Sequence, residues 1–356
     1  MIAQPNETRF TETGKRTANE FLTGPRVPAV DLDWIRGLPK VELHTHLESV
    51  NPVLMEKLAR RAGRNGAPAL ASNDSLDDLL GYLDEVGSLF TTVEDLSEMA
   101  FQLSERAARS GAHYIEVIFN VTHWRSNWGH RWEEFYNGLD QGFTMAERAG
   151  HARARLAVSV MRTQTVDAAK ALVEYLALRR PPRVVALSVD GNETSAGLTG
   201  EKLGPAFRLA REKGLRRTVH TGESGDASHI WDSLKHLEIE RIDHGFRCVT
   251  DASLVEHLRL SRIPLTICPS FNVVLGWVPS IESHPLEFLR KSGVRITLNT
   301  DISWGFVLAD EYKLCADTFG WDKAILRQLA ANSIEASFAS EDEKRVLLSS
   351  LAAYPD

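Results

Sequence analysis

Short runs of apolar and β-branched residues recur along the chain at long intervals. Apolar side chains nearly fill each run instead of alternating with polar ones, which is typical of strands buried on both faces of a parallel sheet. The eight runs are VELHTHL (41–47), HYIEVIFNV (113–121), RLAVSVM (155–161), VVALSV (184–189), RRTVHTG (216–222), ERIDHGF (240–246), PLTICPS (264–270) and RITLNTD (295–301). The pattern therefore predicts a sheet of eight buried parallel strands.

Segments with helical periodicity lie between these runs, and Gly or Pro marks many of the joins. The segments include 96–109, 133–149, 166–178, 201–213, 230–237 and 285–291. Strands alternating with helices over about 260 residues predict an α/β fold, a (β/α)₈ TIM barrel. The interval 48–112 is too long for one crossover, so extra helices are expected near 53–63 and 76–89, over the C-terminal mouth of the barrel. The segment 309–351 predicts two or three closing helices.

The first 30 residues are polar and end near the Pro-containing GPRVP, so we expect a flexible N-terminal arm over 1–30. The remainder contains no repeat, low-complexity tract or obvious linker. We therefore expect a single barrel domain over 31–356.

Composition places the chain among ordinary globular proteins, with 43% hydrophobic and 25% charged residues. The net charge of −7 and the absence of a basic segment argue against nucleic-acid binding. Cys248, Cys268 and Cys315 form neither a disulfide framework nor a CxxC pair, which fits a reducing compartment. No signal-peptide core and no stretch of ~18 apolar residues occurs, so we expect a cytoplasmic protein without a membrane contact.

Polar residues stand where several of the predicted strands end. Barrel enzymes carry their active sites at the C-terminal ends of the strands, so these residues are expected to meet at one rim although they are far apart in sequence. They are His44, His46, His220, Glu223, His244 and Asp301.

His44 and His46 are two positions apart in a strand, so both side chains face the same side. Two imidazoles inside a barrel are costly unless something binds them. A pair of hydrogen-bonded core histidines is the weaker interpretation, because His220 and Asp301 are expected at the same rim. Three neutral imidazoles and one carboxylate suit one zinc ion per chain with an open position for water. Zinc lowers the pKa of bound water to ~7, which makes hydroxide available at neutral pH.

Glu223 and His244 are the candidates for proton transfer. Glu223 follows His220 by three positions and is either a group that moves a proton near the metal-bound water or a carboxylate satisfying a helix start. His244 is either a functional group or a hydrogen-bonded structural histidine.

The remaining histidines carry weaker signals. His123 and His130 lie after the second strand in HWRSNWGHRW (123–132), whose Trp124, Trp128 and Trp132 are spaced by four. That spacing favours a helix stripe against the core, and the alternative is an aromatic lid over a flat substrate. We expect solvated side chains for His113, His151, His229, His236, His257 and His284.

Several motifs together resemble the adenosine/adenine deaminase family, in order and over about 38–340. They are LPKVELHTHLE (38–48), HTGE (220–223), RIDHGF (241–246), CPSFNVVLG (268–276), LNTD (298–301) and NSIEASF (332–338). The resemblance implies a zinc-dependent (β/α)₈ barrel that hydrolyses the 6-amino group of a purine.

The resemblance also implies roles for individual residues. The zinc ligands are then His44, His46, His220 and Asp301. Glu223 protonates purine N1, and His244 orients the zinc-bound hydroxide that attacks C6 with release of ammonia. The implied substrate-binding residues are Glu48, where the adenosine branch usually has an Asp that contacts the ribose, Gly191 through its backbone N–H to purine N3, and the apolar Leu79, Leu80 and Leu83. A Glu at position 48 is more typical of the adenine branch of the family than of the adenosine branch.

Three positions depart from the family pattern. Ile302 follows Asp301 where the family has a second Asp that makes a polar contact on the N7 side of the purine. Ser49 replaces a Gly, and Phe271 replaces a small residue. The metal-binding motif is thus intact while the part that contacts the substrate is altered.

The predicted function is zinc-dependent deamination of a 6-aminopurine nucleoside or base. One alternative, raised by Ile302, is a deaminase of a modified or N6-substituted purine or another aminated ring, and a second is an inactive binding protein. A binuclear amidohydrolase is disfavoured because SVDGNE (188–193) has no Lys to bridge two metals. A cytidine-deaminase type is excluded because CPSF offers no second Cys.

Overall fold

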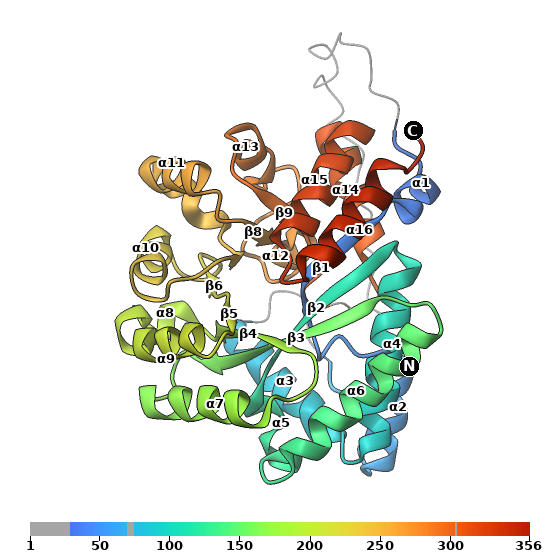
Figure 1. Ribbon diagram of the computed structural model, residues 1–356, viewed down its shortest axis with the longest axis vertical. Helices are drawn as coiled ribbons and strands as arrows, with labels where there is room; N and C mark the ends of the chain where they lie inside the picture. The colour runs from blue at the N-terminus through green and yellow to red at the C-terminus, as the bar shows by residue number, and fades with distance from the viewer. Residues whose placement is uncertain (1–28, 70–74, 303–304) are drawn as a thin grey trace, which may run out of the picture.

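A computed structural model describes residues 29–69, 75–302 and 305–356 (Figure 1). The strands are all parallel and lie where the apolar runs predict them. They are β1 (Lys40–His46), β2 (Ala112–Asn120), β3 (Arg153–Met161), β4 (Val184–Asp190), β5 (Arg216–Arg217), β6 (His220–Thr221), β7 (Ile242–His244), β8 (Leu265–Ile267) and β9 (Ile296–Leu298).

The strands form two ladders that backbone hydrogen bonds join into one barrel. The ladders run β1-β2-β3-β4-β5 and β6-β7-β8-β9. β5 and β6 are two parts of one predicted strand, because Thr218 between them still donates to Leu187 O on β4 at 3.1 Å. At the other junction, Asp301 N donates to His44 O at 3.0 Å and His46 N donates to Asp301 O at 3.2 Å. The (β/α)₈ architecture expected from the sequence is therefore confirmed.

The helices occupy the predicted intervals and surround the strands (Figure 1). The long ones are α4 (Val93–Arg109), α6 (Trp132–Arg148), α7 (Val166–Arg179), α9 (Gly200–Glu212), α10 (Ala227–His236) and α11 (Ala252–Ser261). The chain closes with α14 (Leu308–Phe319), α15 (Lys323–Ala336) and α16 (Glu341–Ala352). The shorter ones are α1 (Leu32–Gly37), α8 (Glu193–Ala196), α12 (Pro269–Val274), α13 (Leu286–Lys291) and the 3₁₀ turn Phe246–Thr250.

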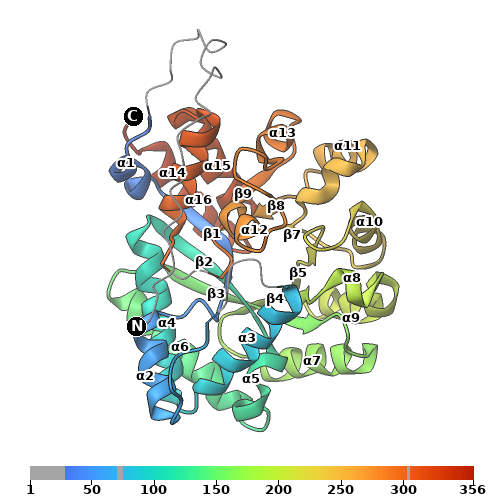
Figure 2. The same ribbon diagram turned by 180° about the vertical axis from the view of Figure 1, so that it is seen from behind.

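Two extra helices, α2 (Pro52–Arg61) and α3 (Leu76–Leu89), fill the long interval after β1, as predicted. A capping box between Ser75 and Asp78 starts α3. Asp77 of α3 accepts a hydrogen bond from Asn192, just beyond β4, at 3.1 Å. Figure 2 shows α3 lying beside α5 (Val121–Trp128), the helix that follows β2. Since both contacts are with segments that follow strand ends, α3 covers the C-terminal mouth.

The tryptophan-rich segment after β2 is helical and packs inward. Trp124 and Trp128 are fully buried on α5, and both rings contact Phe135 of α6. The helix-stripe interpretation is confirmed for these two residues. The alternative of an aromatic lid is wrong for them, because their rings belong to the packing between α5 and α6.

The three cysteines are free and buried. In the part of the chain that the structure covers, no helix is both long enough and apolar enough to cross a membrane. The arm expected over 1–30 lies almost wholly outside the described residues, so the division into an arm and one domain over 31–356 stays a prediction.

Candidate functional site

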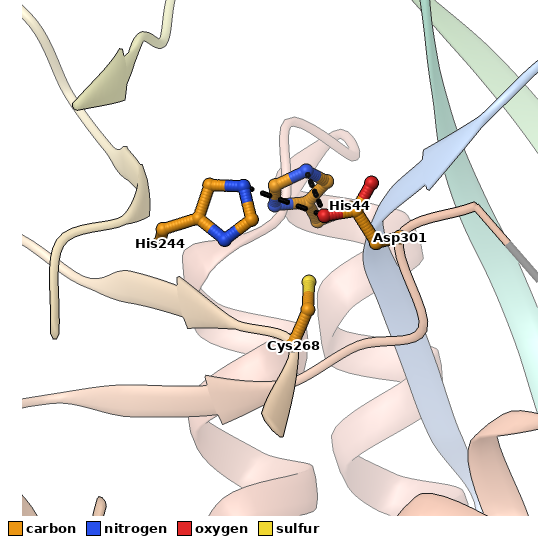
Figure 3. A group of neighbouring side chains, drawn as sticks. All are labelled: His44, His244, Cys268 and Asp301. Atoms are coloured by element: carbon orange, nitrogen blue, oxygen red, sulfur yellow. Dashed lines mark ion pairs between the residues drawn. The ribbon is translucent and has the colours of Figure 1, made fainter. Parts of the chain in front are cut away.

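All six polar residues expected at the rim have side-chain atoms that converge at the C-terminal end of β1. His44 and His46 of β1 face inward, and the Nε2 atoms of His46 and His220 are 3.2 Å apart. The Asp301 carboxylate lies 3.6 Å from His44 Nε2 and 3.4 Å from His46 Nε2. Figure 3 shows the Asp301 carboxylate joined by dashed lines to the rings of His44 and His244, with Cys268 below them. All of these side chains are buried.

The histidine and aspartate atoms fit a divalent metal. His44, His46 and His220 form a group whose ligand atoms all lie within 4.8 Å of one another. In a tetrahedral site with Zn–N bonds of ~2.05 Å, two ligand atoms lie roughly 3.3 Å apart, close to the separations observed here. His44 Nε2 is buried and has no hydrogen-bond partner among the described residues. A metal ion would satisfy this atom.

Hydrogen bonds on the far side of two rings leave the inward nitrogens free. His44 Nδ1 lies 3.3 Å from Thr266 O, and His220 Nδ1 lies 3.2 Å from Val189 O. A carbonyl accepts only an N–H, so the proton of each neutral ring sits on Nδ1 and the lone pair on Nε2. Burial, together with the neighbouring imidazoles, holds the pKa of His44 and of His46 well below the usual value. Both rings are thus in the neutral form that binds metals.

The backbone at Asp301 and at His244 is strained. Asp301 has φ of +57° and His244 has φ of +66°, in the left-handed region that non-glycine residues avoid. Such a conformation costs on the order of 1–3 kcal/mol and is tolerated where the surroundings require it. Burial raises the pKa of Asp301 to about 6, because nearby charges only partly offset the loss of solvent.

His244 and Glu223 form a close pair, with His244 Nε2 2.8 Å from Glu223 Oε2 and 3.3 Å from Asp301 Oδ2. Burial lowers the pKa of His244, but the carboxylates of Glu223, Asp301 and Asp243 together outweigh it, and the result is a pKa of about 9. The arrangement gives His244 a place in the site and argues against a purely structural ring.

Asn272 and His284 form a line of polar contacts at Nδ1 of His244, the nitrogen that does not contact Glu223 and Asp301. Asn272 Nδ2 lies 3.3 Å from His244 Nδ1, and Asn272 Oδ1 lies 3.1 Å from His284 Nε2. His284 was expected to be solvated, and that expectation is wrong: the residue is buried behind the site. The sequence SHP (283–285) around His284 is typical of an exposed loop. The contact of His284 with Asn272 arises only when the chain is folded.

Sequence reasoning missed Glu193, which holds the segment carrying Glu223. The fully buried Glu193 carboxylate accepts a hydrogen bond from the Thr221 hydroxyl at 2.7 Å. It also accepts from four successive backbone N–H groups, Gly222 at 2.9 Å, Glu223 at 3.1 Å, Ser224 at 3.2 Å and Gly225 at 2.8 Å. Arg162 Nη2 lies 3.8 Å from the same carboxylate and balances its charge. The five acceptor contacts fix the backbone from which Glu223 projects.

We expect Glu193→Gln to lower kcat about 10–100-fold while KM changes less than about threefold, because an amide NH₂ cannot accept from the N–H groups it would face. Metal content, measured by elemental analysis, should stay unchanged. Glu201→Gln, an exposed position on α9, is the matched control. Wild-type kcat in Glu193→Gln would show that Glu193 does not position Glu223.

The expected substrate-binding residues lie around this cluster. Glu48 is buried and accepts from Trp124 Nε1 at 2.6 Å, while its Oε2 has no partner among the described side chains and backbone groups. Burial raises the pKa of Glu48 to about 7. Gly191 has φ of +100°, and a Cβ there would meet Met161 Sδ at 2.6 Å, so only Gly fits. Their contacts with a substrate stay predictions.

The apolar candidates are buried as expected, with Leu79 and Leu83 on the inner face of α3 and Ile302 directly after Asp301. Leu80 is only partly buried and packs against the core. Their part in substrate binding stays a prediction.

Two other residues near the ligands take roles that the sequence did not suggest. Ser49 Oγ donates to Asp301 O at 3.1 Å, so this departure from the family pattern helps to hold a candidate ligand. Cys268 Sγ groups with the ligand atoms of His44, His244 and Asp301 within 4.8 Å. Burial raises the pKa of this thiol well above its usual value, so a neutral thiol lies at the base of the site.

The chain is similar to known proteins over nearly its whole length. The family model described as Adenosine deaminase matches residues 39–354. An adenine deaminase of Rhodopseudomonas palustris is 30% identical over 331 residues, which cover 90% of this chain and 95% of that protein. The crystal structure of an adenine deaminase from Arthrobacter aurescens has a TM-score of 0.80 at 29% identity, covering 89% of this chain and 99% of that one.

Two further structures bear on the metal and the substrate. An amidohydrolase from Burkholderia ambifaria with bound Zn has a TM-score of 0.82 at 25% identity, covering 93% of this chain and 94% of that one. The structure of an N6-mAMP deaminase from Arabidopsis has a TM-score of 0.77 at 25% identity, covering 90% of this chain and 99% of that one. The zinc in the first and the histidine–aspartate group here both indicate a divalent metal site. The match over nearly the whole chain shows that it belongs to the adenosine deaminase family and is a hydrolytic deaminase.

Proposed function

We propose that the chain is a zinc enzyme that converts a free 6-aminopurine base, of which adenine is the simplest, into the 6-oxo purine and ammonia. The observation that carries this proposal is the buried Glu48 carboxyl next to the cluster, with one oxygen still unpartnered. A free base has an N9–H that such an acceptor can bind, whereas a nucleoside has a sugar there. Relatives about 30% identical to the chain are adenine deaminases, which supports the same substrate class.

In the proposed reaction, the metal is held by His44, His46, His220 and Asp301, all of which fit it as described. When bound, zinc lowers the pKa of a coordinated water so that hydroxide is available at neutral pH. The residues of the chain do the rest. His244, held by Asn272, orients the attacking oxygen toward C6 and stabilises the negative charge that develops.

Glu223 supplies the proton in this proposal. Its carboxyl group, 2.8 Å from His244, protonates N1 as the C–O bond forms at C6, which makes the carbon more electrophilic. The proton of the new C6 hydroxyl group passes to the amino group, the C6–N6 bond breaks as the 6-oxo group forms, and ammonia leaves. The other proton of the attacking water restores the Glu223 carboxyl group. Gly191 offers its backbone N–H to N3, and Leu79 and Leu83 cover the ring. The retention of every candidate ligand and of Glu223 and His244 argues against an inactive binding protein.

An ammonia-release screen tests the proposed function. The substrates are adenine, adenosine, 2′-deoxyadenosine, AMP, N6-methyl-AMP, 7-deazaadenine and a pterin. We expect adenine to give the highest kcat/KM. Release of ammonia from a nucleoside or nucleotide with none from adenine would overturn the free-base assignment.

A second candidate, a deaminase of an altered or N6-substituted ring, is favoured by Ile302. This residue is only 2% exposed and stands where the resemblance implies a carboxylate near N7. An isoleucine can form no hydrogen bond there, so the N7 side of the ring meets an apolar surface. The likeness to an N6-mAMP deaminase keeps such substrates within the screen.

We expect Ile302→Asp to separate the two candidates. If the pocket has merely lost a contact to plain adenine, a restored carboxyl should raise kcat/KM for adenine by about tenfold, the value of one charge-assisted hydrogen bond. If the pocket suits another ring, the buried carboxylate is unpaired and kcat/KM for the best screened substrate should fall. Ile302→Leu keeps the apolar surface and is the control. Because the proposed substrate is plain adenine, we expect the first result, and a fall in kcat/KM for the best screened substrate would support the second candidate instead.

A further inference from the structure

His123 is a buried polar residue near the site that the reaction described above does not use. It lies on α5, and its side chain is 3% exposed. His123 Nδ1 is 2.7 Å from Asp84 Oδ1 of α3, the helix that covers the barrel mouth. Asp84 is 64% exposed, so this contact lies at the outer side of the ring. The close approach of α3 to α5, where a Cβ on Gly87 would meet His123 O at 2.2 Å, keeps the two helices in this register.

The other nitrogen of His123 points inward. Nδ1 and Nε2 lie on different sides of an imidazole, so a ring that meets Asp84 at its outer side directs Nε2 toward the interior. Nε2 is buried and has no hydrogen-bond partner within the described residues. A buried polar atom without a partner costs about 1–3 kcal/mol, so its retention points to a ligand that binds it.

Glu48 provides a second unpartnered atom in the same place. The residue after His123 on α5 is Trp124, whose indole N–H donates to Glu48 Oε1 at 2.6 Å. Glu48 Oε2 is buried and, like His123 Nε2, has no hydrogen-bond partner in the parts of the chain that the structure covers. The carboxylates of Glu48 and Asp190 act electrostatically on the His123 ring, and that ring in turn acts on His46. These electrostatic contacts place the His123 ring near both Glu48 and His46.

Together the two groups present one hydrogen-bond donor and one acceptor. With a proton on the imidazole, His123 donates and Glu48 accepts. With the proton on the carboxyl group, Glu48 donates and His123 accepts. The pair thus offers a ligand one donor and one acceptor whether the proton lies on His123 or on Glu48.

We propose that His123, oriented by Asp84, binds the substrate together with Glu48, and that the pair recognises the N3–C4–N9 edge of a purine without a substituent on N9. This edge carries one acceptor, N3, and one donor, N9–H, so it complements the pair. N3 is then shared with the Gly191 N–H. A substituent on N9 removes the donor and leaves a buried acceptor without a partner. This inference rests on the proposed deamination of a free base and names the residues that select it.

The test compares adenine with 9-methyladenine in the zinc-loaded wild-type protein, His123→Leu and Asp84→Asn. We expect the wild-type protein to prefer adenine by at least ~100-fold in kcat/KM, since sites built to bind an N–H reject analogues that lack it. His123→Leu should lower kcat/KM for adenine by about 10–100-fold and that for 9-methyladenine by less than about threefold, because the N9 methyl group already keeps this edge of the ring out of contact with both members of the pair. Asp84→Asn should shift the preference in the same direction by a smaller factor.

A binding measurement gives a readout apart from turnover. We expect calorimetric titration with hypoxanthine to give a Kd about tenfold weaker in His123→Leu than in wild type. His130→Leu, an exposed histidine after the same helix, is the matched control and should match wild type in both assays. Circular dichroism shows whether the variants fold, and Asp84→Asn carries the test if His123→Leu does not.

The outcomes separate the inference from the function on which it rests. If His123→Leu lowers kcat/KM equally for adenine and 9-methyladenine, or leaves the Kd for hypoxanthine unchanged, the assignment of His123 is wrong. Either result would leave the proposed deamination intact. A wild-type protein that releases no ammonia from adenine would instead contradict the proposed function. Weaker hypoxanthine binding in His123→Leu would then still support the recognition of the N9 edge.

Discussion

His220→Ala is expected to leave the protein with neither bound metal nor measurable deamination. His220 contributes one of the three converging imidazoles, and its Nε2 lies 3.2 Å from that of His46. Two imidazoles and a carboxylate hold a divalent ion far less tightly than three imidazoles and a carboxylate, and the water that the reaction needs is then not activated. We expect metal content below about a tenth of the wild-type value and a loss of kcat/KM of at least ~10³-fold, more than from any single hydrogen bond.

Stability should change in parallel. A metal that binds only the folded chain adds RT ln(1 + [M]/Kd), about 2.7 kcal/mol at a concentration 100 times Kd. Zinc should therefore raise the melting temperature of the stripped wild-type protein and leave that of His220→Ala unchanged. His257→Ala, an exposed histidine on α11, should retain metal, activity and the zinc-induced shift. Full activity in His220→Ala after exhaustive chelation would contradict a metal at this position.

Glu223→Gln is expected to keep the metal and the fold but to lose turnover by about 10²–10⁴-fold, the usual value of a positioned general acid. The amide has nearly the same size as the carboxyl group but cannot deliver a proton to N1. The loss should appear in kcat, because the substrate still enters the same pocket. Steady-state kinetics with the best screened substrate and elemental analysis for zinc measure the two effects.

The control for this variant is Glu212→Gln, an exposed position on α9 that we expect to behave as wild type. A rate above roughly a tenth of wild type in Glu223→Gln would mean that the proton reaches N1 by another route. A loss of zinc in Glu223→Gln would instead place Glu223 among the groups that hold the metal.

The order of the barrel strands and the rim residues were predictable because both depend on local pattern. Continuous apolar runs mark parallel strands, and a polar residue at the end of such a run has few places to go except the mouth of the barrel. His44 and His46 show this most clearly, since a spacing of two in a buried strand directs both rings inward.

The residues that support the site could not be found in this way. Glu193, His123 and His284 each lie in or next to a segment whose polar residues look like ordinary loop or helix-surface positions. Their partners come from elsewhere in the chain: Glu193 receives its bonds from the segment after β6, and His284 meets Asn272 of α12. Contacts of this kind depend on the packing of the helices around the barrel, which hydrophobic periodicity does not encode.

The junction between β1 and the segment after β9 has a consequence for the motion of the protein. The hydrogen bonds that close the barrel there run between the backbone of Asp301 and the backbones of His44 and His46, whose side chains are three of the four candidate metal ligands. A metal ion bound to these side chains therefore links β1 to the segment after β9, at the point where hydrogen bonds close the barrel. When the metal is removed, the hydrogen bonds between Asp301 and β1 should open more often than those in the rest of the barrel. The amide protons of His46 and Asp301 should then exchange with solvent faster than those within the β2–β3 ladder.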